Sequence, residues 1–123
     1  MLNDFSDKAS LSGRCLLFGI AVIKFCEKLP QKRANWIIAD QIIRSSTSIG
    51  ANIVEARASS SRIELKKFYE IALKSSNETL YWLEMLKELK TEDRDVLLKI
   101  IDEAIEINKM VAGAVIKLKV KKL

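Results

Sequence analysis

The stretch "RSSTSIGANIVEA", residues 44–56, decides the fold, because it is the least helix-like part of an otherwise periodic chain. It contains four consecutive hydroxyl side chains, a glycine and an asparagine, so a loop or a catalytic serine cluster is also conceivable. Small or apolar residues nevertheless recur at alternating steps of three and four, the period of one helical face: Ala39, Ile42, Ser46, Ile49, Ile53 and Ala56. Because Gly50 costs a helix about 1 kcal/mol relative to alanine, we expect tertiary packing to hold this segment helical.

The rest of the sequence has the same period, and no segment alternates with the two-residue period of a strand. We predict helices at about 9–28, 31–57, 62–89 and 92–119. Ser61 and Glu64 form a capping-box pattern before the third helix, and Thr91 is the expected cap of the fourth. Short connections favour antiparallel neighbours. The predicted fold is therefore all-α, a single domain over residues 1–123 that forms an antiparallel up-down-up-down four-helix bundle.

The chain of 123 residues contains no histidine. Histidine is the commonest transition-metal ligand and the usual general base near neutral pH, so a helical ribonuclease that uses arginine and histidine is excluded. Carboxylate-only metal chemistry would need clustered inward-facing acids, and Glu55 and Glu78 alone do not supply them. We therefore expect no catalytic residue, no metal and no cofactor.

The longest mostly apolar run, residues 15–23, is shorter than the roughly 20 residues needed to cross a bilayer. The first residues include acids instead of the basic region of a secretory signal. On one helix Cys15 and Cys26 would lie too far apart for a disulfide. We expect a cytoplasmic protein with two reduced cysteines in its core.

A second, polar stripe runs beside the apolar face of the predicted helix 31–57. In one interpretation its small side chains allow close helix packing while their hydroxyls bond to carbonyls of the same helix. In the other, the stripe belongs to a network between helices, because a hairpin that turns near Ser59 would bring Arg44 and Glu78 together. A catalytic role is disfavoured, since these serines have no base beside them. The candidate structural network comprises Gln41, Arg44, Ser48, Asn52, Glu55, Ser75 and Glu78.

Two segments, "DQIIRSSTSIGANIVEA" (40–56) and "KKFYEIALKSSNETLYWLEMLK" (66–87), resemble the four-helix-bundle proteins encoded by intervening sequences in bacterial 23S rRNA genes. The resemblance covers roughly half the chain. Positions of the family pattern are matched here by Gln41, Arg44, Ser48, Ile49, Asn52, Ile53, Glu55, Phe68, Ala72, Ser75 and Glu78. The chain departs from the pattern at Ala56, where relatives commonly have glycine, and at Gly50, where many have proline.

The resemblance implies an up-down bundle that assembles into a ring-shaped homopentamer. It also implies association with RNA or DNA, since accessory proteins of diversity-generating retroelements share this fold and bind nucleic acid and a reverse transcriptase. The family has no agreed enzymatic activity. The predicted function is therefore that of a non-enzymatic, self-assembling bundle that binds nucleic acid. The alternative is an accessory subunit that binds a partner protein such as a reverse transcriptase.

The net charge of +5 admits a nucleic-acid partner. In an up-down bundle the second connection and both termini share one end, which would carry the candidate nucleic-acid-binding residues Arg57, Arg62, Lys66, Lys67, Lys117, Lys119, Lys121 and Lys122. A solvated lysine tail that aids solubility is the competing interpretation. The basic segments lack a base-reading motif and interleaved aromatics, so contacts would be to the backbone. Trp36, Tyr81 and Trp82 cannot all enter one slim core, and we predict that some line a subunit interface.

Overall fold

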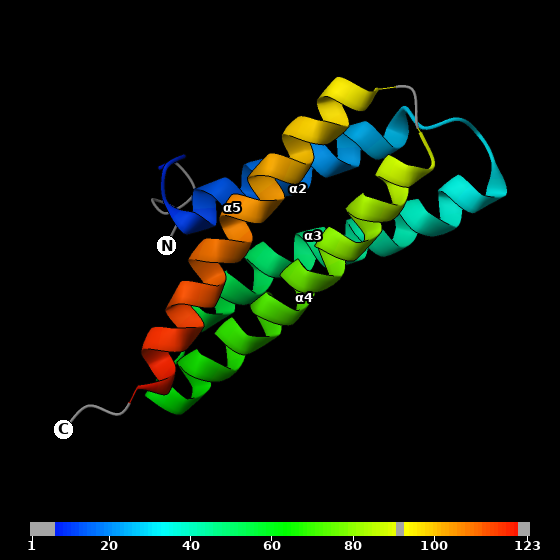
Figure 1. Ribbon diagram of the computed structural model, residues 1–123. Coiled ribbons are helices and arrows are strands. Elements are labelled where there is room, and N and C mark those ends of the chain that lie inside the picture. The colour runs from blue at the N-terminus through cyan, green and yellow to red at the C-terminus, as the bar shows by residue number, and fades with distance from the viewer. Residues whose placement is uncertain (1–6, 91–92, 121–123) are drawn as a thin grey trace.

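A computed structural model describes residues 7–90 and 93–120, and within these ranges the chain forms four helices and no strand (Figure 1). The helices are α2 (Leu11–Glu27), α3 (Arg33–Arg57), α4 (Arg62–Glu88) and α5 (Arg94–Lys119). Each helix packs against two others, in the order α2, α3, α4, α5 and back to α2. Between the described parts of the diagonal pairs, α2 with α4 and α3 with α5, no Cα atoms lie within 8 Å. The predicted all-α four-helix bundle is confirmed.

Neighbouring helices run in opposite directions, as Figure 1 shows. Ser45 of α3 contacts Thr79 of α4, whereas Ser48, one turn later on α3, contacts Ser75, one turn earlier on α4. The residue pairs that join α2 to α3 and α4 to α5 follow the same descending order. The short connections leave no room for parallel neighbours, as the sequence pattern predicts.

Serine side chains begin two of the helices. Ser10 accepts a hydrogen bond from the Gly13 amide at the start of α2, and Ser61 accepts one from the Glu64 amide at the start of α4. The Glu64 carboxylate accepts from the amide of Ser60, at 3.1 Å, which is one residue before the usual partner in a capping box. The predicted cap of α5, Thr91, and Glu92 lie outside the described residues, and α5 begins later than expected, at Arg94.

The hydroxyl-rich stretch is helical throughout, because its apolar side faces the core of the bundle and the adjoining side with the serines is buried as well. Ile49 and Ile53 are at most 1% exposed in the core, and Ser45 and Ser46 are fully buried beside them. At Gly50 the helices α2 and α3 approach so closely that an added Cβ would lie 3.0 Å from the Cβ of Cys15. Packing therefore offsets the weak helix propensity of these residues.

Cys15 and Cys26 are both buried with free thiols. Burial raises the pKa of Cys15 to about 12 and that of Cys26 to about 11, since an apolar surrounding disfavours the thiolate. Among the described helices, none combines the length and the apolarity needed to cross a membrane.

Candidate functional site

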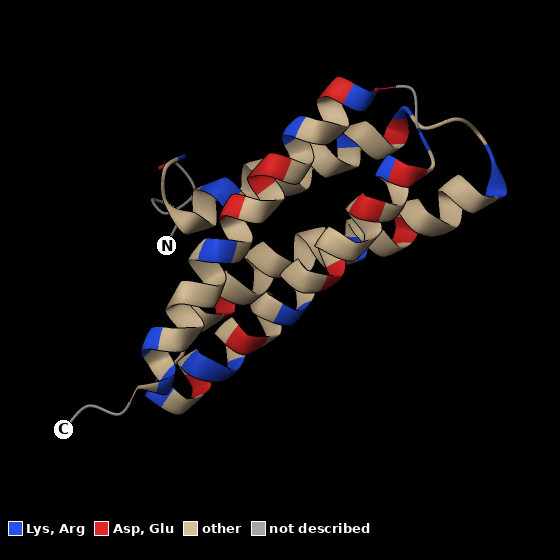
Figure 2. Ribbon diagram, viewed as in Figure 1, with Lys and Arg blue, Asp and Glu red and all other residues tan. Residues whose placement is uncertain are grey.

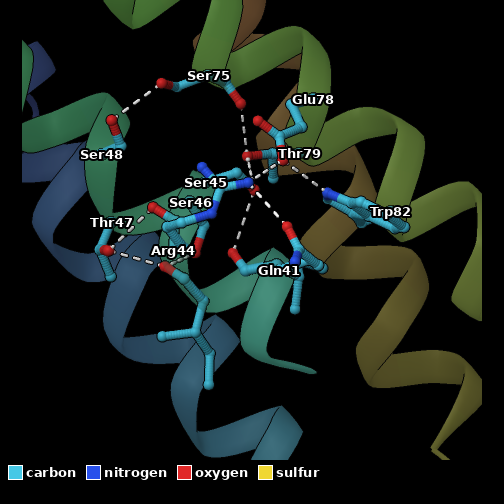
Figure 3. Close-up of polar contacts among 12 residues, drawn as sticks. Gln41, Arg44, Ser45, Ser46, Thr47, Ser48, Ser75, Glu78, Thr79 and Trp82 are labelled. Atoms are coloured by element: carbon cyan, nitrogen blue, oxygen red, sulfur yellow. Dashed lines mark hydrogen bonds and ion pairs between the residues drawn. The ribbon is translucent and has the colours of Figure 1, made fainter. Parts of the chain in front are cut away.

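The predicted network between α3 and α4 has an outer, partly exposed cluster (Figure 3). Arg44 forms an ion pair with Glu78 and also donates to the side-chain oxygen of Gln41 at 2.9 Å. The indole of Trp82 donates to the Glu78 carboxylate at 3.0 Å. The hydrogen bond from Trp82 lowers the pKa of Glu78 most, and the hydrogen bond from Arg44 lowers it further, because both favour the ionised carboxylate. Since the ion pair is solvated, it orients the two helices more than it stabilises them.

An inner cluster of hydroxyl and amide groups joins the same two helices. Ser48 and Ser75 share a hydrogen bond of 2.9 Å, and Asn52 donates to both the carbonyl and the hydroxyl oxygen of Ser48. The Thr79 hydroxyl lies 2.9 Å from the hydroxyl of Ser45 and 2.8 Å from the carbonyl of Ser75 (Figure 3), so its single hydrogen serves the Ser75 carbonyl or the Ser45 oxygen. Ser45 and Thr79 are fully buried, so their mutual bond satisfies groups that would otherwise be costly to bury.

The remaining hydroxyls of the stretch bond within α3. Ser46 and Thr47 both donate to the carbonyl of Ile43, at 3.3 and 2.7 Å. The structure thus contains both arrangements considered from the sequence, with interhelical bonds on the α4 side of α3 and bonds to its own carbonyls on the other side.

Six of the seven predicted network residues come together, and Glu55 does not. It is exposed and lines a groove between α2 and α3, away from the contacts of Ser75 and Glu78. Sequence reasoning did not assign Thr79 and Trp82 to the network, although the position of Thr79 on the core face of its helix was a usable signal. Among the described residues, no group of three or more His, Cys, Asp or Glu side chains could hold a metal ion.

Two further polar contacts, which the sequence did not reveal, hold α5 in place. Asn108 donates to Ser76 and Asn77 of α4, each at 2.9 Å. Arg14 of α2 makes a two-pronged contact with Glu103 at 2.6 and 2.9 Å, the strong geometry for an arginine and a carboxylate. Polar side chains therefore join α5 to both of its neighbours.

Basic residues gather at the end of the bundle where α3 joins α4 and α5 ends (Figure 2). We call this the basic end; its described members are Arg57, Arg62, Lys66, Lys67, Lys74, Lys117 and Lys119. Lys121 and Lys122 lie outside the described residues. Sequence reasoning missed Lys74, because its place depends on how α4 is rotated against α5.

The predicted binding residues differ in how they are used. The Arg62 guanidinium donates to the carbonyls of Lys117, Leu118 and Val120 at 3.2 to 3.4 Å, so it closes the last turn of α5. The Arg62 guanidinium is therefore partly engaged in hydrogen bonds within the bundle and is less available to a phosphate group.

The other lysines are placed differently. Lys67, Lys74 and Lys119 line one groove between α4 and α5, of about 480 Å³, with Glu70 as the acidic member. All three lysines are exposed. They can therefore contact an anion without unfolding any part of the bundle.

The four antiparallel helices and the hydroxyl network across α3 and α4 define a small helical-bundle protein. The chain belongs to the 23S rRNA-intervening sequence protein family, whose sequence model matches residues 12–113, so the predicted family is confirmed. It is similar to the crystal structure of a protein of unknown function from the S23 ribosomal protein family of Bacteroides thetaiotaomicron VPI-5482, with 34% identity and a TM-score of 0.78. That alignment covers 85% of this chain and 97% of the other. No match was found among curated proteins.

Proposed function

We propose that this chain is a non-enzymatic, self-assembling helical bundle that binds the phosphate backbone of RNA or DNA. The observation that carries the proposal is the groove at the basic end, which Lys67, Lys74 and Lys119 line together, with Glu70 as the one acid among its described lining residues. Three ammonium groups along one groove suit a chain of phosphates better than a single small anion. None of the described residues that line the groove is aromatic, so no base could stack there and binding would depend little on sequence.

Assembly strengthens this mode of binding. In a homopentamer, which we propose from the family relationship, the basic end would be repeated around the ring axis. Several weak sites on one ring would then act on one nucleic acid, and their effective affinity would exceed that of a single bundle. Exposed aromatic residues support assembly, since Trp36 is 59% and Tyr81 is 60% exposed and such residues are enriched at interfaces.

The test is a salt titration of binding to a random single-stranded RNA and to duplex DNA, followed by fluorescence anisotropy. The variant Lys67→Glu/Lys74→Glu/Lys119→Glu is expected to lower the slope of log K against log salt by about 2 to 3, for three lost phosphate contacts. The control, Lys24→Glu/Lys28→Glu/Lys32→Glu, changes the net charge equally at the opposite end and should retain most of the slope. Absence of binding by the wild type at low salt would refute the proposal.

The second candidate is an accessory subunit that binds a partner protein, such as a reverse transcriptase. The exposure of Trp36 and Tyr81 favours it, because tryptophan and tyrosine dominate the energetics of protein interfaces. Capture of a purified reverse transcriptase by the wild type, lost in Trp36→Ala/Tyr81→Ala, would support this candidate. Equal capture by both chains, or by neither, would count against it.

A further inference from the structure

Among the apolar surfaces that the described part of the bundle leaves open to solvent, two lie on opposite sides, and the first is concave. It is a groove of about 410 Å³ between α2 and α3, lined mainly by Leu16, Ile20, Ile23, Thr47, Ala51 and Val54. Leu16 is 45% and Ile20 is 41% exposed, which is unusual for large apolar side chains beside each other on one helix. The hydroxyl of Ser12, which also lines the groove, is buried and has no hydrogen-bond partner among the residues that the structure describes. We call this surface the apolar groove.

The second face is a row of side chains on α5, which we call the α5 ridge: Leu98, Ile101, Ile105 and Ala112. Their steps of three, four and seven place them on one side of the helix. Asn108 belongs to the same side and bonds to α4, so the ridge lies on the α4 side of α5. Leu98 is 36% and Ile105 is 38% exposed, although a stripe with this spacing is typical of a packed helix face.

The two faces lie on opposite sides of the molecule. The helices α2 and α3 form one side of the bundle and α4 and α5 form the other, because only neighbours around the square are in contact. From this arrangement, and building on the self-assembly proposed above, we infer that the apolar groove of one copy receives the α5 ridge of the next copy. Such a contact is heterologous, since it joins two different patches, and it generates a ring when the rotation between copies closes.

Length and charge favour a second copy as the occupant of the groove. The groove residues Leu16 to Ile23 extend over about 10 Å of helix, and so does the part of the ridge between its exposed large side chains, Leu98 and Ile105. Glu55 lies at the edge of the groove, and Lys109 is one turn from Ile105 beside the ridge.

Lys109 is largely free to turn toward a neighbouring copy. Its side chain is 70% exposed, and its ion pair within α5 is a loose contact of 3.6 Å to Glu106. A pair between Lys109 and Glu55 of the next copy would fix the register of the two faces and favour this partner over an uncharged apolar ligand.

The test uses two variants that each block one face. Ala51→Arg places a charge in the apolar groove, Ile105→Arg places one on the α5 ridge, and both positions tolerate a long side chain because they are partly or fully exposed. Each variant alone is expected to lose the assembly and to show the mass of one chain, 13.9 kDa, by light scattering. Val96→Arg, at an exposed position on the α2 side of α5, is the matched control and should assemble like the wild type.

Mixing the two variants makes the test directional. The groove-blocked chain keeps its ridge and the ridge-blocked chain keeps its groove, so an equimolar mixture should form dimers and nothing larger. A wild type that is itself a monomer would refute the self-assembly part of the proposed function, and this inference with it. Assembly of the wild type that survives in both variants would overturn only the present inference. The absence of dimers in the mixture, or a small apolar ligand in the groove with assembly unchanged, would overturn it as well.

Discussion

Gly50 and Gly113 allow the same substitution to be compared in two surroundings. Replacing a glycine in a helix interior by alanine gains about 1 kcal/mol from the backbone alone. No heavy atom outside α5 lies within 4 Å of a Cβ added at Gly113, so Gly113→Ala is expected to stabilise the fold by about that amount. At Gly50 the new carbon would lie 3.0 Å from the Cβ and 3.7 Å from the carbonyl carbon of Cys15.

The contact at Gly50 is expected to cancel this gain or to turn it into a loss of stability. Carbon atoms prefer separations of about 3.5 to 4.0 Å, and the atoms of Cys15 can yield only if α2 itself moves away from α3. Such overpacking costs about 1 to 3 kcal/mol. The gain in helix propensity offsets about 1 kcal/mol of it, so Gly50→Ala should range from neutral to about 2 kcal/mol destabilising.

Urea unfolding of the wild type and both variants, followed by circular dichroism, measures this difference. All curves must be recorded at one protein concentration, because assembly makes the apparent stability depend on concentration. We expect the two variants to differ by about 1 to 3 kcal/mol in the free energy of unfolding. If Gly50→Ala stabilises the chain as much as Gly113→Ala does, the close approach of α2 and α3 is not what keeps alanine out of this position.

Ser45→Ala and Thr79→Val should each cost about 1 kcal/mol, while the double variant should cost less than the sum, because it leaves neither hydroxyl without its partner; additive costs would argue against a direct bond. The lowered pKa of Glu78 means that the fold favours the carboxylate, so the stability advantage over Glu78→Gln should be complete above about pH 4.5 and vanish as the pH falls through the folded pKa. An advantage that persists in stronger acid would contradict this. Since burial raises the pKa of Cys15 to about 12 and of Cys26 to about 11, a maleimide should label them near neutral pH only in urea; rapid labelling of the folded chain would contradict their burial.

Periodicity was sufficient to predict the helices, including the hydroxyl-rich stretch, because a helical face repeats at the same spacing whatever residues occupy it. Periodicity was also sufficient to predict that Arg44 lies close to Glu78, since the short connection between α3 and α4 fixes the register of the two helices. Glu55 was wrongly placed for a physical reason. The contacts of Ser45 with Thr79 and of Ser48 with Ser75 set the antiparallel register of the two helices, and this register places Glu55 near the level of Phe68, which has no hydrogen-bonding group. There the Glu55 side chain is exposed and lines the groove between α2 and α3 instead.

The role of Arg62 could not be read from the sequence at all. Its positive charge and its position at one end of the bundle led to the prediction that Arg62 binds phosphate. The last carbonyls of α5, however, have no partners within their own helix, and the Arg62 guanidinium donates to them. That contact joins residues 56 positions apart, so it depends on the packing of α4 against α5. Local pattern assigns a side chain to a face of its helix, and only the assembled bundle decides what lies opposite.

The stretch that decides the fold also explains how the bundle can be rigid inside and open outside. On its α4 side, Ser45 and Ser48 bond directly to partners on α4, which fixes the register of the two helices without large side chains. On its α2 side, Gly50 lets α2 approach closely, while Thr47 and Ala51 add little bulk above the contact and leave the apolar groove unfilled. Larger apolar residues at these positions would fill the groove from within and remove the place for a second copy. The small polar composition therefore suits a helix that must contact two neighbours in its own chain and still present a hollow surface to a third.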